Sequence, residues 1–209
     1  MSDLKIKLYH YWRSSCSWRV RWSLFFKGIP FDAVAVDLLK SEQKQRGYLS
    51  KNPSAYVPCL NFRDEYFSES YAILEWLEEK FPSPRLLPQD INLRLKIREF
   101  CLKIVSGTQP LQNLVVMRHH DEDKGEQNIW SKHWIERGLL SCESLLPDLE
   151  QCFCFGEELS LADLCLVPQI YNAKRFNIDV SLFPKLKKIH DNCLKLDSCK
   201  KSHPDSFKP

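Results

Sequence analysis

The sequence lacks any apolar stretch near the length of about 18 residues that marks a membrane-spanning helix. Its start is charged from Asp3 onward, so we expect neither a signal peptide nor a membrane span. It also lacks an excess of one charge, because 30 Lys and Arg residues stand against 27 Asp and Glu residues in a chain of 209. A net charge of +3 does not predict nucleic-acid binding on electrostatic grounds.

Paired C-x-x-C motifs are missing as well, although the chain contains nine cysteines. Cys152 and Cys154 have no histidines at the spacing of a zinc finger, so we expect no structural metal site. An odd number of scattered cysteines does not fit the disulfide scaffold of a small secreted domain. We therefore expect reduced thiols and a cytoplasmic protein.

Short apolar segments with a period of two residues are present in the first eighty residues. Leu4, Ile6 and Leu8 alternate with polar residues, as in a half-buried strand. Further strands are expected at residues 31–37, 57–62 and 66–67, followed by a helix from Ser70.

Residues 16–24 are harder to interpret, because apolar and polar residues alternate there almost perfectly. This periodicity favours a strand. A strand at this place would follow the first one directly and leave the second strand without a crossover connection. The pattern alone therefore leaves the segment open.

A proline-rich stretch divides the chain, since Pro82, Pro84 and Pro88 cannot continue a helix. After it the apolar spacing becomes helical. Helices are expected over residues 93–104, from Trp130 to Leu139 with an extension toward Leu149, and after a capping box at residues 160–163. We expect an α/β domain at 1–82, a linker at 83–90 and an all-helical domain at 91–209.

Four segments resemble one family in the same order, and the resemblance covers essentially the whole chain. Residues 14–21 (SSCSWRVR) are similar to the signature of the zeta-class glutathione transferases, which include maleylacetoacetate isomerases. Residues 84–88, 109–114 and 162–169 resemble further segments of that family. The family fold is a thioredoxin-like domain followed by an all-helical domain. It implies that residues 16–27 form the first helix, which overrules the strand.

The resemblance implies glutathione as cofactor, an anionic tripeptide whose thiol has an ordinary pKa of about 8.5. A helix N-terminus favours an anion, and serine hydroxyls there can donate hydrogen bonds to sulfur. Ser14 is implied as the main thiolate stabiliser, beside Ser15 and Cys16; a plain N-cap is the alternative for Ser14. Cys16 either lines the site or only packs. A dithiol site needs cysteine at both ends of a C-x-x-C motif, whereas residues 14–17 have serine at both ends, so we expect no dithiol chemistry.

The resemblance implies further glutathione contacts outside this turn. Val57 is expected to pair with the cysteinyl part next to a cis Pro58. Glu69 and Ser70 are expected at the γ-glutamyl end; zeta members commonly have Gln where this chain has Glu69. The other implied contacts are Ser17, Trp18, Arg19, Gln43, Gln109 and Asn113.

The implied reaction is the cis–trans isomerisation of maleylacetoacetate to fumarylacetoacetate in tyrosine and phenylalanine breakdown, with activity on small electrophiles such as α-haloacids. A dianionic substrate needs positive charge, for which Arg13, Arg19 and Arg175 are candidates. His119 and His120 are expected in a solvated loop. The resemblance also implies a homodimer. Conjugation of a different electrophile and non-catalytic glutathione binding stay open.

Overall fold

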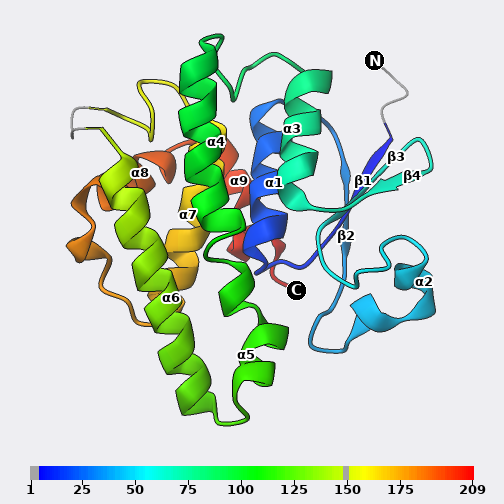
Figure 1. Ribbon diagram of the computed structural model, residues 1–209. Helices are drawn as coiled ribbons and strands as arrows, with labels where there is room; N and C mark the ends of the chain where they lie inside the picture. Colours follow the sequence, from blue (N-terminus) through cyan, green and yellow to red (C-terminus); the bar gives the residue numbers. More distant parts are fainter. Residues whose placement is uncertain (1–4, 148–150) are drawn as a thin grey trace. The chain divides into compact units, whose positions relative to one another are not determined.

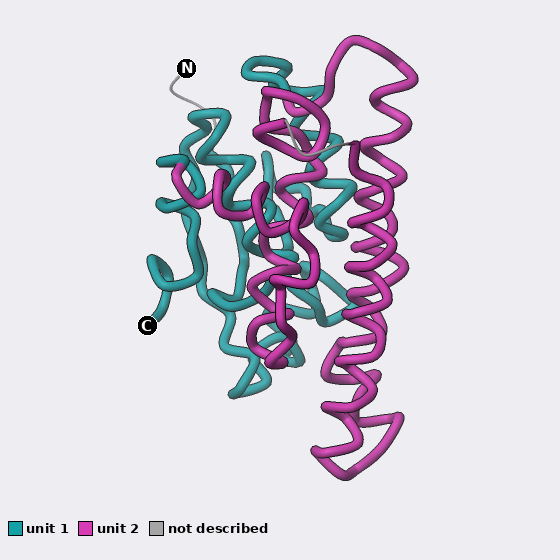
Figure 2. The backbone as a smooth tube through the Cα atoms, turned by 90° about the vertical axis from the view of Figure 1, so that its left-hand side faces the viewer, with its two compact units in different colours: residues 1–85, 196–209 teal, residues 86–195 magenta. Residues whose placement is uncertain are grey.

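A computed structural model describes residues 5–147 and 151–209; Leu4 and Leu149, each part of an expected element, lie outside the described residues. The chain forms two compact units, coloured separately in Figure 2. Unit 1 consists of Met1–Arg85 with Leu196–Pro209, and unit 2 of Leu86–Lys195. No helix formed by the described residues is long and apolar enough to cross a membrane.

Unit 1 alternates strands and helices before its C-terminal segment. Its strands are β1 (Ile6–His10), β2 (Asp32–Ala35), β3 (Cys59–Phe62) and β4 (Glu65–Phe67). Its helices are α1 (Ser15–Phe26), α2 (Arg46–Leu49), α3 (Ser70–Lys80) and α9 (Asp197–Ser202), with 3₁₀ turns η1 (Glu42–Lys44) and η4 (Pro204–Phe207). The four expected strands and the helix from Ser70 are confirmed.

The four strands form one mixed sheet in the order β2-β1-β3-β4. Strand β1 is parallel to β2 and antiparallel to β3, with Leu8 opposite Ala33 on one side and Leu60 on the other. Strands β3 and β4 are antiparallel. Figure 1 shows α1 and α3 on one side of the sheet and α2 on the other. This is the thioredoxin-like arrangement expected for the first domain.

Alternation along the strands divides the core of unit 1 between the two faces of the sheet. Ile6, Leu8, Leu60 and Phe62 pack with apolar residues of α1 and α3 in one buried cluster. Tyr9 and Cys59, which are adjacent to Leu8 and Leu60 in the strands, pack with Val36 and Tyr48 in a second cluster. The period of two therefore identified the strands correctly, because each face meets a different layer.

The helix implied by the family resemblance for residues 16–27 is confirmed as α1, and the strand favoured by periodicity is wrong. The alternating pattern failed because every residue from 17 to 24 is buried, Arg19 and Arg21 included. A helix that is covered all round needs no separate polar face. Polar side chains can alternate with apolar ones there only because the surroundings supply hydrogen-bond partners.

The last fourteen residues return to unit 1, whereas we expected the helical domain to run to residue 209. Trp18 and Trp22 of α1 lie fully buried and donate their indole N–H groups to the hydroxyls of Ser202 and Ser198, at 3.0 and 3.1 Å. A buried indole N–H requires an acceptor, and this segment provides two. The segment thus packs against α1 within unit 1.

Unit 2 is built from helices. These are α4 (Ile91–Val105), α5 (Leu114–His120), α6 (Lys124–Leu145), α7 (Leu161–Arg175) and α8 (Pro184–Cys193), with 3₁₀ turns η2 (Pro110–Gln112) and η3 (Val180–Leu182). Helices α4 and α7 pack against each other, and α7 is buried along most of its length. The helices expected over residues 93–104 and 130–139 are confirmed.

The capping box expected at residues 160–163 is confirmed at the start of α7. The Asp163 carboxylate is completely buried and accepts hydrogen bonds from the Ser160 N–H, the Ser160 hydroxyl and the Cys154 N–H, each at 2.8 Å. Burial nevertheless raises the pKa of Asp163. One side chain therefore starts the central helix of unit 2 and fixes the chain that precedes it.

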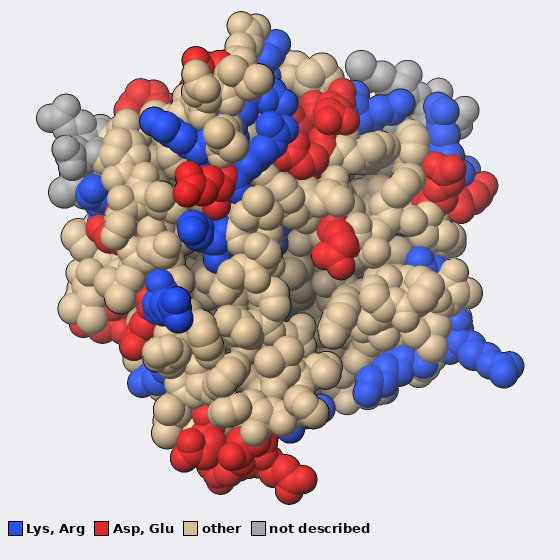
Figure 3. Space-filling model, viewed as in Figure 1, with Lys and Arg blue, Asp and Glu red and all other residues tan. Residues whose placement is uncertain are grey.

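The expected loop around His119 and His120 is shorter than the polar composition suggested. Both histidines are exposed, but they belong to the last turn of α5. Helix α6 begins directly afterwards, because the Asp123 side chain accepts the N–H groups of Gly125 and Glu126. Acidic side chains gather at this turn, at the lower end of Figure 3.

Candidate active site

The turn that follows β1 presents Ser14 at the N-terminus of α1. The Ser14 hydroxyl oxygen accepts the Ser17 N–H at 3.2 Å, with extended backbone angles at Ser14, so this residue is the N-cap of the helix. A hydroxyl has two lone pairs and one proton, and the cap uses only a lone pair. The capping role and a role as donor to a thiolate are therefore compatible.

Burial changes abruptly within the segment that resembles the family signature. Residues 13–16 are half-buried, whereas residues 17–19 are buried. The Ser17 hydroxyl accepts the Tyr11 N–H at 3.4 Å, and Trp18 donates to Ser202. The side chains of Ser17 and Trp18 thus hold the turn in place, while Ser14, Ser15 and Cys16 are accessible on its outside.

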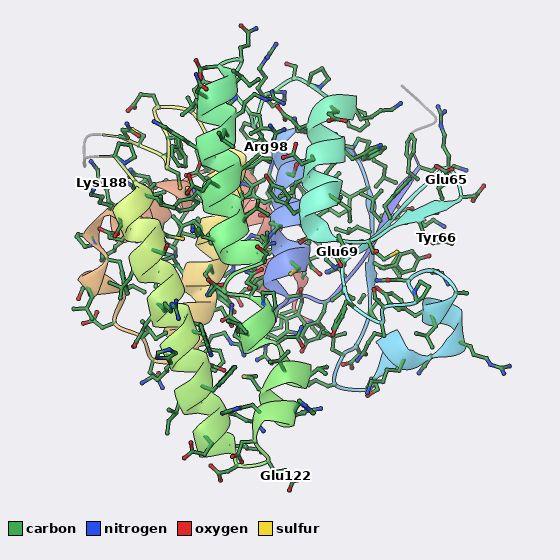
Figure 4. All side chains as sticks on the ribbon, in the orientation of Figure 1. Glu65, Tyr66, Glu69, Arg98, Glu122 and Lys188 are labelled. Atoms are coloured by element: carbon green, nitrogen blue, oxygen red, sulfur yellow. The ribbon has the colours of Figure 1, made fainter. Side chains whose placement is uncertain are left out.

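A second helix N-terminus is joined to the first by Arg19. The completely buried Arg19 donates from Nη1 to the Ser70 hydroxyl at 3.1 Å, and Ser70 is the first residue of α3. The exposed Glu69, labelled in Figure 4, precedes it with φ 66°, a left-handed conformation that costs a non-glycine residue energy. Two helix N-termini and a buried guanidinium make this end of unit 1 suited to anionic groups.

The loop before β3 contains the expected cis peptide bond between Val57 and Pro58. The carbonyl of Tyr56 accepts hydrogen bonds from the Tyr48 hydroxyl at 2.5 Å and from the Asn52 side chain at 2.8 Å, which fixes the approach to Val57. Gln43 lies in η1, with its side-chain oxygen buried and without a hydrogen-bond partner among the described residues. This oxygen is thus an unused acceptor among the described residues.

The expected site residues of unit 2 lie on η2, α5 and α7. Gln109 precedes η2, and Asn113 caps α5 by accepting the Val115 N–H at 3.0 Å. Arg175 is exposed at the end of α7 and donates from Nη1 to the Asn172 side-chain oxygen at 2.9 Å. In unit 1, the third candidate cation, Arg13, lies over the Trp12 ring at 5.3 Å.

Comparison with known proteins identifies the family. Residues 13–80 match the family model described as the N-terminal domain of glutathione S-transferases. The chain is 42% identical over 207 residues to probable maleylacetoacetate isomerase 2 of Drosophila melanogaster, covering 98% of this chain and 90% of that protein. The zeta-class glutathione S-transferase of Euphorbia esula is 41% identical over 204 residues, covering 96% of this chain and 91% of that protein. This chain belongs to the zeta class of glutathione transferases.

Solved structures agree with this assignment. The maleylacetoacetate isomerase of Anaeromyxobacter dehalogenans 2CP-1 with bound GSH superposes with a TM-score of 0.90 at 40% identity, covering 98% of this chain and 97% of that one. A holo maleyl pyruvate isomerase, described as a bacterial glutathione S-transferase in the zeta class, gives a TM-score of 0.92 at 33% identity, with coverage of 97% and 98%.

The sequence did not identify Arg21 as a residue that fixes the turn before Ser14 in this zeta-class chain. Arg21 donates to the carbonyls of Tyr11 at 3.4 Å and Trp12 at 2.9 Å, directly before Arg13 and Ser14, and to His10 Nδ1 at 3.0 Å. Burial and the Arg21 charge lower the pKa of His10 to about 4, so its imidazole is neutral and accepts. The sequence signal was the second arginine in the alternating segment.

The cysteines of this zeta-class chain are mostly protonated thiols in the core. Burial raises the pKa of Cys59 to about 11 and those of Cys142 and Cys199 to about 12. Cys59 therefore does not supply a thiolate at neutral pH, although it follows the cis-proline. Among residues 5–147 and 151–209, no three His, Cys, Asp or Glu side chains are grouped to hold a metal ion.

Proposed function

We propose that this protein catalyses the glutathione-dependent cis–trans isomerisation of maleylacetoacetate to fumarylacetoacetate, in tyrosine and phenylalanine breakdown. The observation that carries the proposal is the half-buried Ser14 hydroxyl at the N-terminus of α1, with its proton available for a sulfur anion. Relatives named maleylacetoacetate isomerase, similar over nearly the whole chain, support the choice of substrate.

The residues of unit 1 fit glutathione by their chemistry. The tripeptide carries a thiol and two carboxylates, and this end of unit 1 offers two helix N-termini with serine hydroxyls. Ser14, with Ser15 and Cys16 beside it, would hold the sulfur, and Ser70 would hold the γ-glutamyl carboxylate. Val57 would pair with the cysteinyl backbone, Gln43 would meet the glycine carboxylate, and Glu69 would pair with the α-amino group.

Unit 2 supplies the proposed recognition of the substrate. Arg175 is an exposed cation, and guanidinium groups bind carboxylates through paired hydrogen bonds. We assign Arg175 to a carboxylate of maleylacetoacetate, with Arg13 as a second cation. Gln109 and Asn113 would complete the glutathione contacts. Arg19 acts differently, since it is buried and holds Ser70.

The chain contributes positioning and electrostatics to the reaction. Glutathione would supply, when bound, a thiolate able to add reversibly to the cis double bond and to leave again as the thiolate, which would permit rotation about this bond. The Ser14 hydroxyl and the α1 N-terminus lower the free energy of the sulfur anion. Arg175 holds the substrate carboxylate and thereby fixes the double bond, which lowers the entropic cost of reaction.

We also propose that the protein acts as a homodimer in the cytoplasm. Ile91, Leu95 and Leu102 lie on one face of α4 and are 76%, 66% and 46% exposed. Such an apolar row on a helix is typical of an interface between subunits. Light scattering during gel filtration measures the mass directly, and a mass of one chain at micromolar concentration would contradict the dimer.

The decisive experiment measures isomerisation of maleylacetone with and without glutathione. We expect turnover only with glutathione. Replacing the hydroxyl in Ser14→Ala should lower kcat/KM about 100-fold, because one donor to the reacting anion is lost. Ser68→Ala, another half-buried loop serine of unit 1, is the control and should leave turnover unchanged. Full activity of Ser14→Ala would show that another group stabilises the thiolate.

The same assay separates the alternative functions. Fast conjugation of an aryl halide or an α-haloacid with negligible isomerisation would identify a transferase for a different electrophile. Glutathione binding in calorimetry without turnover of any electrophile would identify a non-catalytic binding protein. Either result would overturn the isomerase.

A further inference from the structure

A row of four polar side chains extends from η2 to the exposed end of α7. Gln112 of η2 is 9% exposed, and Gln169 of α7 is completely buried. Asn172 is half-buried, and Arg175 is exposed. Because residues three apart on a helix are neighbours, Gln169, Asn172 and Arg175 lie along one side of α7.

The hydrogen bonds from Arg175 to Gln112 have one direction, and the two glutamines exchange a pair of bonds. Arg175 Nη1 donates to Asn172 Oδ1 at 2.9 Å, and Asn172 Nδ2 donates to Gln112 Oε1 at 2.6 Å. Gln112 Nε2 donates in turn to Gln169 Oε1 at 2.7 Å, and Gln169 Nε2 donates back to Gln112 Oε1 at 3.4 Å. The row thus connects an exposed cation to two buried amides.

The chemistry of arginine explains the direction from Arg175 to Gln112. A guanidinium only donates, so the Asn172 oxygen must face Arg175 and its NH₂ group must face Gln112. Gln112 then presents its oxygen to Asn172 and its NH₂ group to Gln169. Each amide is polarised by the one before it, which strengthens the row as a whole.

We infer that Asn172 is a positioning residue that holds the Arg175 guanidinium ready for a substrate carboxylate, and that Gln112 and Gln169 anchor Asn172. An exposed arginine has many rotamers, and fixing it on binding costs free energy. The Asn172 oxygen fixes Arg175 before the anion arrives, while the buried glutamines fix Asn172. The inference rests on the proposed role of Arg175.

The anchor of the row also adjoins the proposed glutathione contacts. Gln112 lies between Gln109 and Asn113 in sequence and directly precedes the α5 cap. The same buried amides therefore hold the segment assigned to the cofactor and the arginine assigned to the substrate. Loss of Asn172 should affect only the anion, because Asn113 keeps its own bond to Val115.

The test measures the Kd of maleate, a small dicarboxylate, by calorimetry at saturating glutathione. Asn172→Ala should raise this Kd about fivefold, because the Arg175 side chain must then be fixed when the anion binds. Arg175→Ala should raise it more, and the double variant should bind no more weakly than Arg175→Ala. Asn128→Ala, an exposed asparagine on α6, is the matched control and should not change the Kd.

Asn172→Asp distinguishes positioning from a structural role. Aspartate keeps the shape of the residue and an acceptor for Arg175, so a structural role predicts a milder effect than for alanine. Positioning predicts the reverse order, because the new carboxylate competes with the substrate anion for Arg175. With maleylacetone, both variants should raise KM while kcat and the KM of glutathione stay near wild type.

The inference would be overturned by an unchanged Kd for Asn172→Ala, by additive effects in the double variant, or by no binding of maleate to the wild type. A milder effect of Asn172→Asp than of Asn172→Ala would also contradict it. The proposed function has a separate outcome. Maleate binding that depends on Asn172, without isomerisation of maleylacetone, would support the inference and contradict the isomerase.

Discussion

Helices α1 and α7 are both buried along most of their length, one in each unit, but different interactions hold them. Helix α7 is largely apolar where it is buried, and its start is fixed by Asp163, whose partners lie within nine residues. Helix α1 carries two buried arginines and two buried tryptophans. Its indole groups bond to Ser198 and Ser202, 176 to 184 residues further along the chain.

The difference shows that the partners on which a buried helix depends can lie near it or far from it in the sequence. An apolar segment with its own cap needs only a core to pack against. A buried segment with polar side chains needs a partner for each of them, since an unsatisfied buried group costs about 1–3 kcal/mol. Helix α1 therefore depends on the C-terminal segment, whereas the start of α7 is fixed by residues within nine positions of Asp163.

The largest loss of stability is expected when the long-range interactions of α1 are removed. Arg21→Ala deprives the carbonyls of Tyr11, Trp12 and Ser202 of a donor and leaves a cavity beside Phe207. We expect a loss of about 4 kcal/mol in the free energy of unfolding, measured by urea denaturation. Arg46→Ala, an exposed arginine of α2, should change it by less than about 0.5 kcal/mol. Equal effects would contradict the dependence of α1 on its buried charge.

The variant Asp163→Ala tests the buried cap at the start of α7. The change removes the cap and leaves the buried N–H groups of Cys154 and Ser160 without an acceptor. We expect a loss of about 3 kcal/mol in the same denaturation experiment. Asp179→Ala removes an exposed cap of η3 and should cost less than about 1 kcal/mol. A similar cost at both positions would show that burial does not determine the value of the cap.

The buried pair of His10 and Arg21 makes the stability of unit 1 depend on pH. His10 has a pKa of about 4 in the folded protein, below its ordinary value of 6.5, so the unfolded state binds the proton first. Stability from this group is complete above pH 6.5 and is lost as the pH falls toward 4, by roughly 2–3 kcal/mol. His10→Asn keeps an acceptor for Arg21 but does not titrate. The free energy of unfolding of this variant should therefore fall less than that of the wild type between pH 6.5 and pH 4. Parallel pH curves for both proteins would refute the assignment.

The smallest effect concerns the start of α3, which has a strained residue where α7 has a cap. Glu69→Gly should raise the free energy of unfolding by about 1 kcal/mol, because glycine adopts φ 66° without strain. It should also weaken glutathione binding in calorimetry, because the carboxylate proposed for the α-amino group is lost. Glu79→Gly, within α3, should instead destabilise by about 1 kcal/mol. A loss of stability in Glu69→Gly would show that the left-handed conformation carries no strain.

Much of the candidate site could be predicted from the sequence through the family resemblance, which indicated Ser14, the cis Val57–Pro58 bond and Ser70. The residues alone could not separate accessible from buried members of the signature. Ser14 and Arg19 are five residues apart, but one is accessible and the other is completely buried. That division depends on which layers cover α1. The support from Arg21 to Tyr11 and Trp12 was missed for the same reason.

The sequence by itself determined the elements whose signals are local: the strands that alternate between two faces, the proline-rich stretch after α3, and the capping box of α7. Their stabilising partners lie within a few residues or on a periodic face, so the pattern carries the information. Only the tertiary structure decided that the C-terminal segment covers the helix at residues 16–24, and that hydrogen bonds connect Gln112, Gln169 and Asn172 to Arg175. These depend on hydrogen bonds between groups far apart in the chain, and a buried polar group is stable only when the fold brings such a partner to it.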